Sequence, residues 1–414
     1  DDPAHFRAFH KTLAELFPRV FSQLEKTEID GNLLFYWKGR SQERPILLMS
    51  HQDVVPAEGA WSHAPFSGNI ADGKVWGRGA SDTKCSVMAF FEAAEQLLAE
   101  GYTPPTDVYL ASSCTEEWAG DGAPKLVAEL QRRGVELFLV CDEGGAIISE
   151  PIGGIPGNFA MVGVFEKGKA DVKFTAKSTG GHASAPGKHT PIARLAAFVT
   201  EVETHSPFKK KLLPEVAAMF RTLAPYASSF GLRLLLGNLW LFAPLLKLVL
   251  PAVSAQAGAM LRTTIAFTTQ SGSDAYNVIP QEATLGANMR FIPHQGEQES
   301  LAIIQTLAEK HGLSTEVLHA NDFTPPVDIH GEAFTLFTCV IGETFPGLAA
   351  SPYVMTGATD AQFYQPICKS CIRFAPVIYS PEQMRGMHGL NENIEYRCLP
   401  GAVRFYQNLI RAEK

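Results

Sequence analysis

Residues 45–53 read PILLMSHQD, a short apolar run that ends at a histidine and an aspartate. Runs of this length and composition are typical of strands that are covered on both faces of a parallel sheet. The same arrangement recurs as DVYLASSCTEE over 107–117 and as ELFLVCD over 136–142. Residues 86–100 and 123–133 lie between these runs and carry apolar residues at helical spacing. The alternation predicts an α/β fold with a doubly wound, mainly parallel sheet.

The pattern changes after residue 167. The next stretch mixes half-exposed strands with one helix, at 171–176, 191–204, 263–267 and 283–291. We therefore expect an inserted α+β domain over 168–292, inside a first domain made of residues 1–167 and 293–414. The first domain should close with a helix over 296–311 and with apolar strands within 335–378.

The composition is that of a globular chain. Of its 414 residues, 46% are hydrophobic and 19% are charged, and the formal net charge is -8. A nucleic-acid groove needs a basic patch, so this balance argues against a nucleic-acid partner. The seven cysteines are an odd number in a long chain, which is not the pattern of a disulfide framework.

Residues 231–253, GLRLLLGNLWLFAPLLKLVLPAV, form the most apolar stretch. Two prolines and two cations interrupt it, which disfavours a single membrane pass. Buried core is one interpretation, and a surface that meets a partner, a lipid-like substrate or a membrane interface is the other. The chain begins at Asp1 rather than Met, so removal of an upstream segment and an extracytoplasmic location stay open.

Acidic and imidazole side chains gather at the predicted strand ends and in one glycine-rich turn, GRGASDTK. They are His51 and Asp53, Asp82, Glu116 and Glu117, and Asp142. Ligands of open α/β sheets bind outside the carboxyl ends of the strands, so these side chains should converge on one crevice. Each residue alone would be read as a helix cap or a loop residue. Together they predict a zinc site, in which one carboxylate bridges two ions and another handles protons.

At these residues the sequence resembles the M20 family of metallopeptidases. The matching motifs occur in family order from residue 47 to residue 394. They are SHQDVVP, GRGASDTK, TEEWAGDGA, CDEGG, GGHASAP, NVIP with ANMRFIP, TGATDAQF and GMHGLNE. The form DEGG and the segment NLWLFAPLL are most similar to the carboxypeptidase S branch, which includes the N-fatty-acyl-amino-acid synthase/hydrolases.

The resemblance implies two Zn²⁺ per subunit, with Co or Mn as substitutes. One zinc would be bound by His51, Asp82 and Asp142, and the other by Asp82, Glu117 and His388, so that Asp82 bridges. Glu116 would be the general base that activates a zinc-bound hydroxide, and Asp53 would orient the ring of His51. The peptide bond between Asp82 and Thr83 would be cis.

The resemblance also assigns residues of the inserted domain, which would serve as a lid and dimerisation domain. His182 would stabilise the oxyanion in the other subunit of a homodimer. Asn277 and Arg290 would hold the substrate carboxylate, and Gly357 would offer backbone contacts to the substrate. Gln362 stands where relatives carry an arginine, so the grip on that carboxylate should rest mainly on Arg290.

The expected function is hydrolysis of the amide bond next to a free carboxylate, in a small peptide or an N-acyl-amino acid. Two alternatives stay open. The enzyme could act on fatty N-acyl-amino acids, as hydrolase or synthase, rather than on peptides. The chain could also be a non-catalytic binding homologue, although a full set of ligands with Glu116 argues against this.

Overall fold

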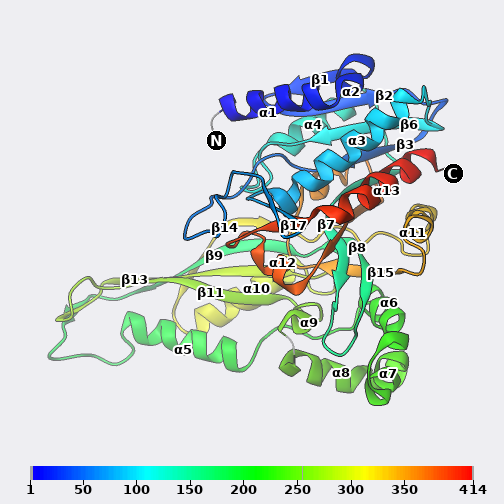
Figure 1. Cartoon of the computed structure of the whole chain (residues 1–414). Helices are drawn as coiled ribbons and strands as arrows, with labels where there is room; N and C mark the ends of the chain where they lie inside the picture. The colour runs from blue at the N-terminus through cyan, green and yellow to red at the C-terminus, as the bar shows by residue number, and fades with distance from the viewer. Residues whose placement is uncertain (1–2, 254, 413–414) are drawn as a thin grey trace. The chain divides into compact units, whose positions relative to one another are not determined.

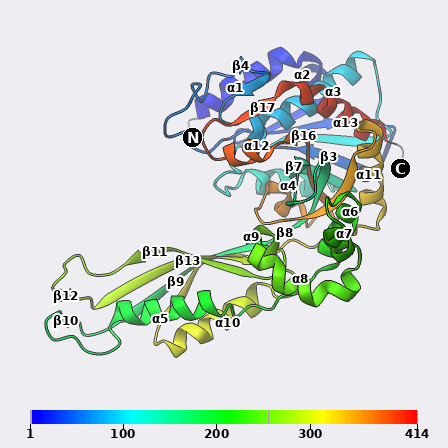
Figure 2. The same cartoon turned by 60° about the horizontal axis from the view of Figure 1, so that its bottom comes forward.

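The computed structural model describes residues 3–253 and 255–412, and it divides into two compact units. The first unit comprises residues 1–165, 215–239 and 325–414, and the second comprises 166–214 and 240–324. Figures 1 and 2 show the elements in two views. Our predicted boundaries, 168 and 293, differ from these in two parts of the sequence. Residues 215–239 belong to the first unit, and residues 293–324 belong to the second.

The first unit is built on a mixed eight-stranded sheet in the order β1-β2-β6-β3-β7-β16-β8-β15. The four central strands, β6, β3, β7 and β16, pair in parallel, whereas β1, β2 and β8 pair antiparallel to their neighbours. This arrangement confirms the predicted α/β class. The strands are β1 Glu25–Ile29, β2 Asn32–Trp37, β3 Ser41–Met49, β6 Thr106–Ser112, β7 Leu139–Ser149, β8 Asn158–Glu166, β15 Ala349–Met355 and β16 Cys371–Tyr379.

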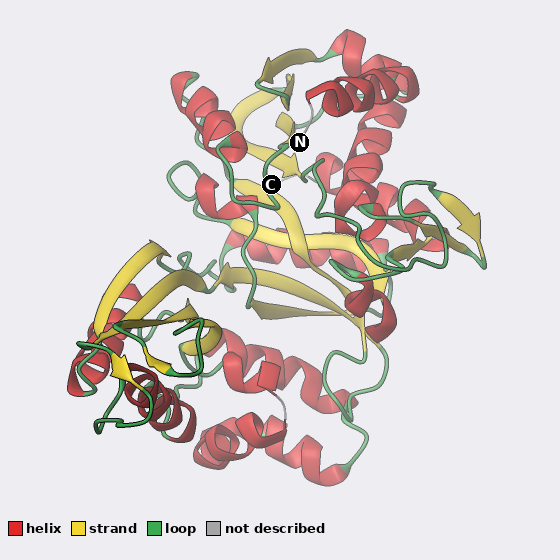
Figure 3. Cartoon of the chain, turned by 90° about the vertical axis from the view of Figure 1, so that its left-hand side faces the viewer, coloured by secondary structure: helices red, strands yellow, loops and turns green. Residues whose placement is uncertain are grey.

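Helices cover both faces of this sheet (Figure 3), and every residue of the central strand β6 is buried. Leu126 and Leu130 of helix α4 pack with Leu47 and Val140 on one face. On the other face, rings of helices α2, α3, α11 and α13 contact rings of β2 and β16. The helices of this unit are α1 Pro3–Leu16, α2 Pro18–Gln23, α3 Cys85–Ala99, α4 Gly122–Arg132, α7 Phe230–Gly237, α11 Glu332–Thr344, α12 Pro381–Gly386 and α13 Leu399–Arg411. Helix α6, Pro214–Leu223, begins at the last residue of the second unit's first segment.

Helix α11 occupies the first part of the range 335–378, within which we predicted apolar strands. Its buried residues include Phe334, Phe337, Val340 and Ile341, which lie three or four positions apart. A short apolar run does not distinguish a buried strand from a buried helix, and this spacing belongs to a helix. Strands β15 and β16 do occupy the rest of that range.

The second unit contains a four-stranded antiparallel sheet in the order β11-β13-β9-β14, with α5 and α10 packed on one face. Buried and half-buried residues alternate along β9, as expected for a sheet with one covered face. A short antiparallel pair of strands, β10 and β12, lies at one end of this unit (Figure 2). The elements are β9 Gly168–Lys177, β10 Gly181–His182, α5 Pro191–Thr204, α8 Leu239–Val253, α9 Ala255–Ala259, β11 Thr264–Ser271, β12 Val278–Ile279, β13 Glu282–Phe291, α10 Glu297–Lys310 and β14 Ser314–Asn321.

Two absences follow from the described residues. All seven cysteines lie among them and are free thiols, in agreement with the expectation of no disulfide framework. None of the described helices is by itself long and apolar enough to cross a membrane. Helices 230–237 and 239–248 reach the required length and composition only as a pair that is sharply bent at its break.

Candidate metal centre

The predicted ligands come from separate elements of the first unit. His51 follows β3, Glu116 and Glu117 follow β6, and His388 follows α12. Asp82 lies in a tight turn, Ala80–Lys84, whose backbone is not helical at Asp82 and Thr83 and which runs directly into α3. The bond between Asp82 and Thr83 is cis, as the resemblance implied. Two strand ends, the turn before α3 and the segment after α12 thus bring these polar side chains to one place.

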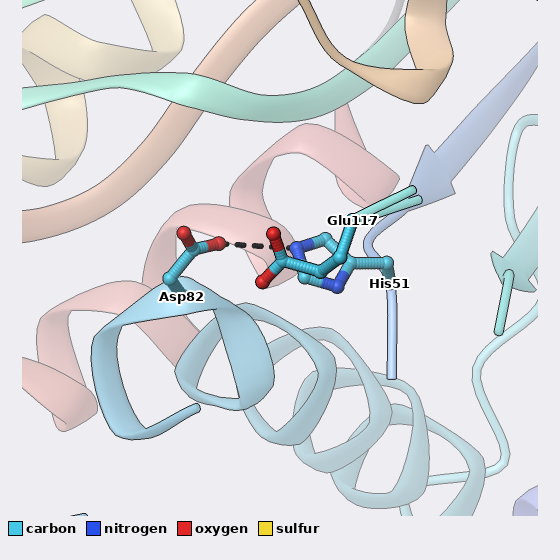
Figure 4. Close-up of side chains that lie close together, drawn as sticks. All are labelled: His51, Asp82 and Glu117. Carbon is cyan, nitrogen blue, oxygen red and sulfur yellow. Dashed lines mark hydrogen bonds and ion pairs between the residues drawn. The ribbon is translucent and has the colours of Figure 1, made fainter. Parts of the chain in front are cut away.

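Asp82 lies between the two histidines. Its Oδ1 is 3.0 Å from Nε2 of His51, and its Oδ2 is 3.0 Å from Nε2 of His388. Glu117 Oε2 is also 3.0 Å from Nε2 of His388. Figure 4 shows His51, Asp82 and Glu117 pointing toward one another. Each oxygen of Asp82 therefore faces a different histidine, which is the arrangement that a carboxylate bridging two cations needs.

Acidic side chains outnumber cations in this cluster. Burial and the nearby charge of Glu143 raise the pKa of Glu116 to about 10. Burial and the charge of Asp82 raise the pKa of Glu143 to about 8. Glu117 Oε1 is buried without a hydrogen-bond partner in the described structure. Carboxylates that are crowded and unpaired in this way fit divalent cations, which bind imidazole and carboxylate together.

Asp53 organises the residues around His51. One of its oxygens lies 3.3 Å from His51 Nδ1, and the two oxygens accept hydrogen bonds from the backbone N–H groups of Glu116 and Glu117, at 3.2 and 3.0 Å. A proton held on Nδ1 leaves the Nε2 lone pair free for a metal. These contacts are those of the orienting role that we expected for Asp53.

Glu143, the neighbour of the predicted ligand Asp142, also reaches His51. Glu143 Oε1 is 3.4 Å from His51 Nε2, and Glu143 joins His51 and Glu116 in one of two groups with metal-ligand spacing. The other group is His51, Asp82 and Glu117. Asp142 instead accepts hydrogen bonds from the backbone N–H groups of Glu143 and Ala361, both at 2.8 Å. The sequence reasoning ended the strand at residue 141, but β7 continues to Ser149, so these two neighbours lie on opposite faces.

Glu392 is a residue of the site that the sequence reasoning did not assign. Its side chain is fully buried, and its Oε2 is 2.7 Å from Nη1 of Arg78. Its two oxygens also accept hydrogen bonds from the backbone N–H groups of Gly79, Ser81 and Asp82, at 3.1, 2.8 and 3.0 Å. It therefore fixes the turn that carries Asp82. The available signal was its position at the end of GMHGLNE, four residues after His388.

A cavity of about 180 Å³ adjoins the cluster within the first unit. Asp82, Glu116, Glu143 and His388 form part of its wall. The rest is mainly apolar, and its larger side chains are Ile148, Met355, Tyr379, Met384 and Met387. The site thus places an apolar surface directly beside the candidate metal ligands, as small-molecule sites usually do.

Gly357 and Gln362 are the residues of this unit that the sequence linked to substrate binding, and both follow β15. Gly357 is exposed, and the next two residues, Ala358 and Thr359, line the cavity. Gln362 donates a hydrogen bond from Nε2 to the backbone carbonyl of Thr359, at 3.1 Å. Gln362 therefore supports the loop after β15.

His182 and Asn277 lie together in the second unit. His182 pairs with Val278 across β10 and β12, and the carbonyl of Asn277 accepts a hydrogen bond from the N–H of Ala183 at 2.9 Å. Nδ1 of His182 accepts a hydrogen bond from the backbone N–H of Ser184 at 3.1 Å. The neutral ring therefore carries its proton on Nε2, which leaves the exposed side of the ring as a hydrogen-bond donor.

Arg290 lies far from this pair within the same unit. It is opposite Lys169 in the β9–β13 ladder, whereas His182 lies beyond Lys177 at the other end of β9. Eight residues of strand span roughly 27 Å. Nε of Arg290 donates to Asn288 Oδ1 at 2.9 Å, which fixes the guanidinium at its end of the sheet.

Known proteins match the chain over nearly its whole length. The sequence profile of Peptidase family M20/M25/M40 matches residues 47–412. The chain is 34% identical to N-fatty-acyl-amino acid synthase/hydrolase PM20D1 of Xenopus tropicalis, over 98% of this chain and 80% of that protein. It is 32% identical to Probable carboxypeptidase S-like 2 of Dictyostelium discoideum, over 98% of this chain and 79% of that protein.

Solved structures share the fold. The M20 family metallo-carboxypeptidase Sso-CP2 from Sulfolobus solfataricus superposes with a TM-score of 0.69 at 17% identity, covering 97% of this chain and 93% of that one. Human carnosine dipeptidase 1 gives 0.66 at 15% identity, covering 99% and 91%. Bacillus subtilis YXEP, described as a dinuclear metal binding peptidase from the M20 family, gives 0.56 at 13% identity, covering 98% of each chain.

Proposed function

Because the chain belongs to peptidase family M20/M25/M40, a family of metal-dependent peptidases, we propose that it is a dinuclear metal hydrolase that cleaves the amide bond next to a free carboxylate. The observation that carries this proposal is the position of Asp82, whose two oxygens face His51 and His388 separately. We take zinc as the metal, with two ions per subunit and Co or Mn as substitutes, since the donors are imidazole and carboxylate.

The residues that would hold the metals follow from the geometry. His51, Asp82 and Glu143 would bind one ion, and Asp82, Glu117 and His388 the other. Glu143 is included because its Oε1 lies 3.4 Å from His51 Nε2, and Asp142, its neighbour in β7, stays the alternative ligand at this position. The bound ions would supply a Lewis acid for the scissile carbonyl and would lower the pKa of a water at the site.

Glu116 is the proposed general base. It lies on the wall of the cavity, and Asp53 holds its backbone N–H. A carboxylate at this position takes a proton from the attacking water and passes it to the leaving nitrogen. His182 of a partner subunit would donate its Nε2 proton to the developing oxyanion, and Arg290 would ion-pair with the substrate carboxylate.

The decisive variant is Glu116→Gln. We expect it to keep its metal content, measured by elemental analysis, and to lose turnover by about 10²- to 10⁴-fold, which is the usual contribution of a general base. Glu58→Gln, which changes an exposed glutamate away from the cluster, is the matched control. A Glu116→Gln enzyme with normal turnover would exclude the proposed role.

The apolar part of the cavity favours a hydrophobic group beside the scissile bond. Two substrate classes fit it. The name of the Xenopus relative suggests N-fatty-acyl-amino acids, and the name of the Dictyostelium relative suggests peptides, among which the cavity would favour those with a hydrophobic residue. Release of phenylalanine from N-oleoylphenylalanine and from leucylphenylalanine, compared as kcat/KM on the zinc-loaded protein, separates these classes. A metal-loaded protein that hydrolyses neither these nor a wider panel would instead be a binding homologue.

A further inference from the structure

Helix α8 of the second unit presents large apolar side chains to solvent. Trp240, Leu241, Leu245 and Leu248 are 83%, 55%, 47% and 69% exposed, whereas Leu246 is 1% exposed. Residues 241, 245 and 248 are spaced four and three positions apart, so they share one face of the helix, and Trp240 is next to them. Soluble chains rarely leave a continuous apolar face of this size uncovered.

The sequence around this helix has an unusual charge. Residues 209–273 contain seven basic residues and one acidic residue, a local charge of +6, while the rest of the chain carries -14. The eight are Lys209, Lys210, Lys211, Arg221, Arg233, Lys247, Arg262 and the acid Glu215.

Part of this charge lies close to α8 itself. Lys247 belongs to the helix, between the exposed Leu245 and Leu248. The N–H of Lys211 donates to the carbonyl of Leu261 at 2.8 Å, which places the lysine triplet beside the chain that leaves α9. One cation thus lies within α8, and the lysine triplet, in which Lys209 also pairs with Glu299 at 3.2 Å, lies beside the segment that follows α9.

We propose that α8 docks on the surface of a lipid bilayer that contains anionic lipid. Leucine side chains on one face of a helix can enter the boundary of the acyl chains, and tryptophan prefers the level of the headgroups. Lysine and arginine attract anionic headgroups, and the long stem of Lys247 lets its ammonium reach them. Pro244 and Pro251 interrupt α8, which suits a helix lying along the surface.

Charge argues against a second copy of the chain as the occupant. A two-fold interface would place this surface against itself, and the basic residues of the two copies would repel. A nucleic acid would match the charge but not the row of leucine side chains. An anionic bilayer matches both properties.

Vesicle flotation tests the proposal directly and needs no substrate, so its outcome is separate from that of the hydrolase assay. The full chain is mixed with vesicles of phosphatidylcholine alone, or with about three parts in ten phosphatidylglycerol. We expect the protein to float with the anionic vesicles, to bind phosphatidylcholine at least about 10-fold less, and to be released as salt rises.

The double variant Trp240→Ser with Leu248→Ser should lose about 10-fold or more of its affinity for the anionic vesicles. Both changes replace exposed side chains, and a thermal melt should match that of the wild type. The matched control is Phe66→Ser with Leu318→Ser, which removes apolar residues that are 72% and 60% exposed elsewhere. This control should bind the vesicles as the wild type does.

Three results would overturn the proposal. The first is a wild type that does not bind anionic vesicles. The second is a double variant at Trp240 and Leu248 that floats as well as the wild type. The third is a wild type that does not bind vesicles while the double variant changes oligomeric state in sedimentation velocity. That result would assign the face to a second copy of the chain.

Discussion

Asp142 and Glu143 are adjacent in β7, and the face of the strand on which each side chain lies decides which of them can reach a metal. Asp142 uses both oxygens to accept backbone N–H groups, while Glu143 lies 3.4 Å from His51. Metal ligation by Glu143 and a structural role for Asp142 make separable predictions, because one role is read by metal content and the other by stability.

Glu143→Gln should therefore lose metal, because an amide is a poor substitute for a carboxylate ligand. We expect the affinity for zinc, measured by competition with a chelator, to fall by at least about 10-fold. Asp142→Asn should keep zinc. Its free energy of unfolding, measured by urea titration, should fall by about 1–3 kcal/mol, because an amide can accept only one of the two N–H groups. The opposite pattern, with zinc lost in Asp142→Asn alone, would restore Asp142 as the ligand.

At the scale of elements, the turn that carries Asp82 depends on a residue more than three hundred positions away. Glu392 pairs with the buried Arg78 and accepts three backbone N–H groups of that turn. A buried carboxylate with this many donors is expensive to alter, because the remaining charge and N–H groups lose their partner. Glu392 is thus a positioning residue for the proposed bridging ligand.

Glu392→Gln should lower stability by about 3–5 kcal/mol and, at a temperature where it is still folded, weaken zinc binding by about 10- to 100-fold. Glu395→Gln is the matched control, because Glu395 pairs with the exposed Arg397 and its loss should change stability by less than about 0.5 kcal/mol. Calorimetric melts of metal-free protein and zinc titrations measure the two effects. A folded Glu392→Gln variant with unchanged zinc affinity would show that Glu392 supports stability only.

Elements also show how far sequence reasoning reached. The apolar runs before His51 and Glu116 identified β3 and β6, because a fully covered strand leaves an unmistakable composition. The end of β7 was missed, since polar residues and glycines inside a strand look the same as a loop. Helix α11 was read as strand, because its buried face is continuous with apolar neighbours. Glu392 was not assigned because its partners are set by tertiary contacts that no local pattern encodes.

At the scale of the whole molecule, the separation of His182 and Arg290 within the second unit limits how one chain can build the proposed active site. Arg290 lies opposite Lys169, and roughly 27 Å of strand separates that position from Lys177, beyond which the chain continues to His182 in β10. On a small substrate, the scissile carbonyl and the free carboxylate lie within about two residue lengths, roughly 7 Å. We therefore expect that the second unit of one chain does not offer both residues to one substrate, and a homodimer in which His182 serves the neighbouring site would resolve this conflict.

Mixed dimers test this condition. His182→Ala and Glu116→Gln should each be nearly inactive as homodimers. After co-expression with two different tags and random assembly, about half of the dimers contain one chain of each kind. In such a dimer the chain with intact Glu116 receives His182 from its neighbour, so one of its two sites is complete, and the whole mixture should reach about a quarter of wild-type turnover. Doubly tagged dimers purified in two steps should reach about half. The control pairs His182→Ala with a chain that carries both substitutions, which leaves no complete site in any dimer. If His182 acted within its own chain, no mixed dimer would recover activity, because each chain would still lack one of the two residues.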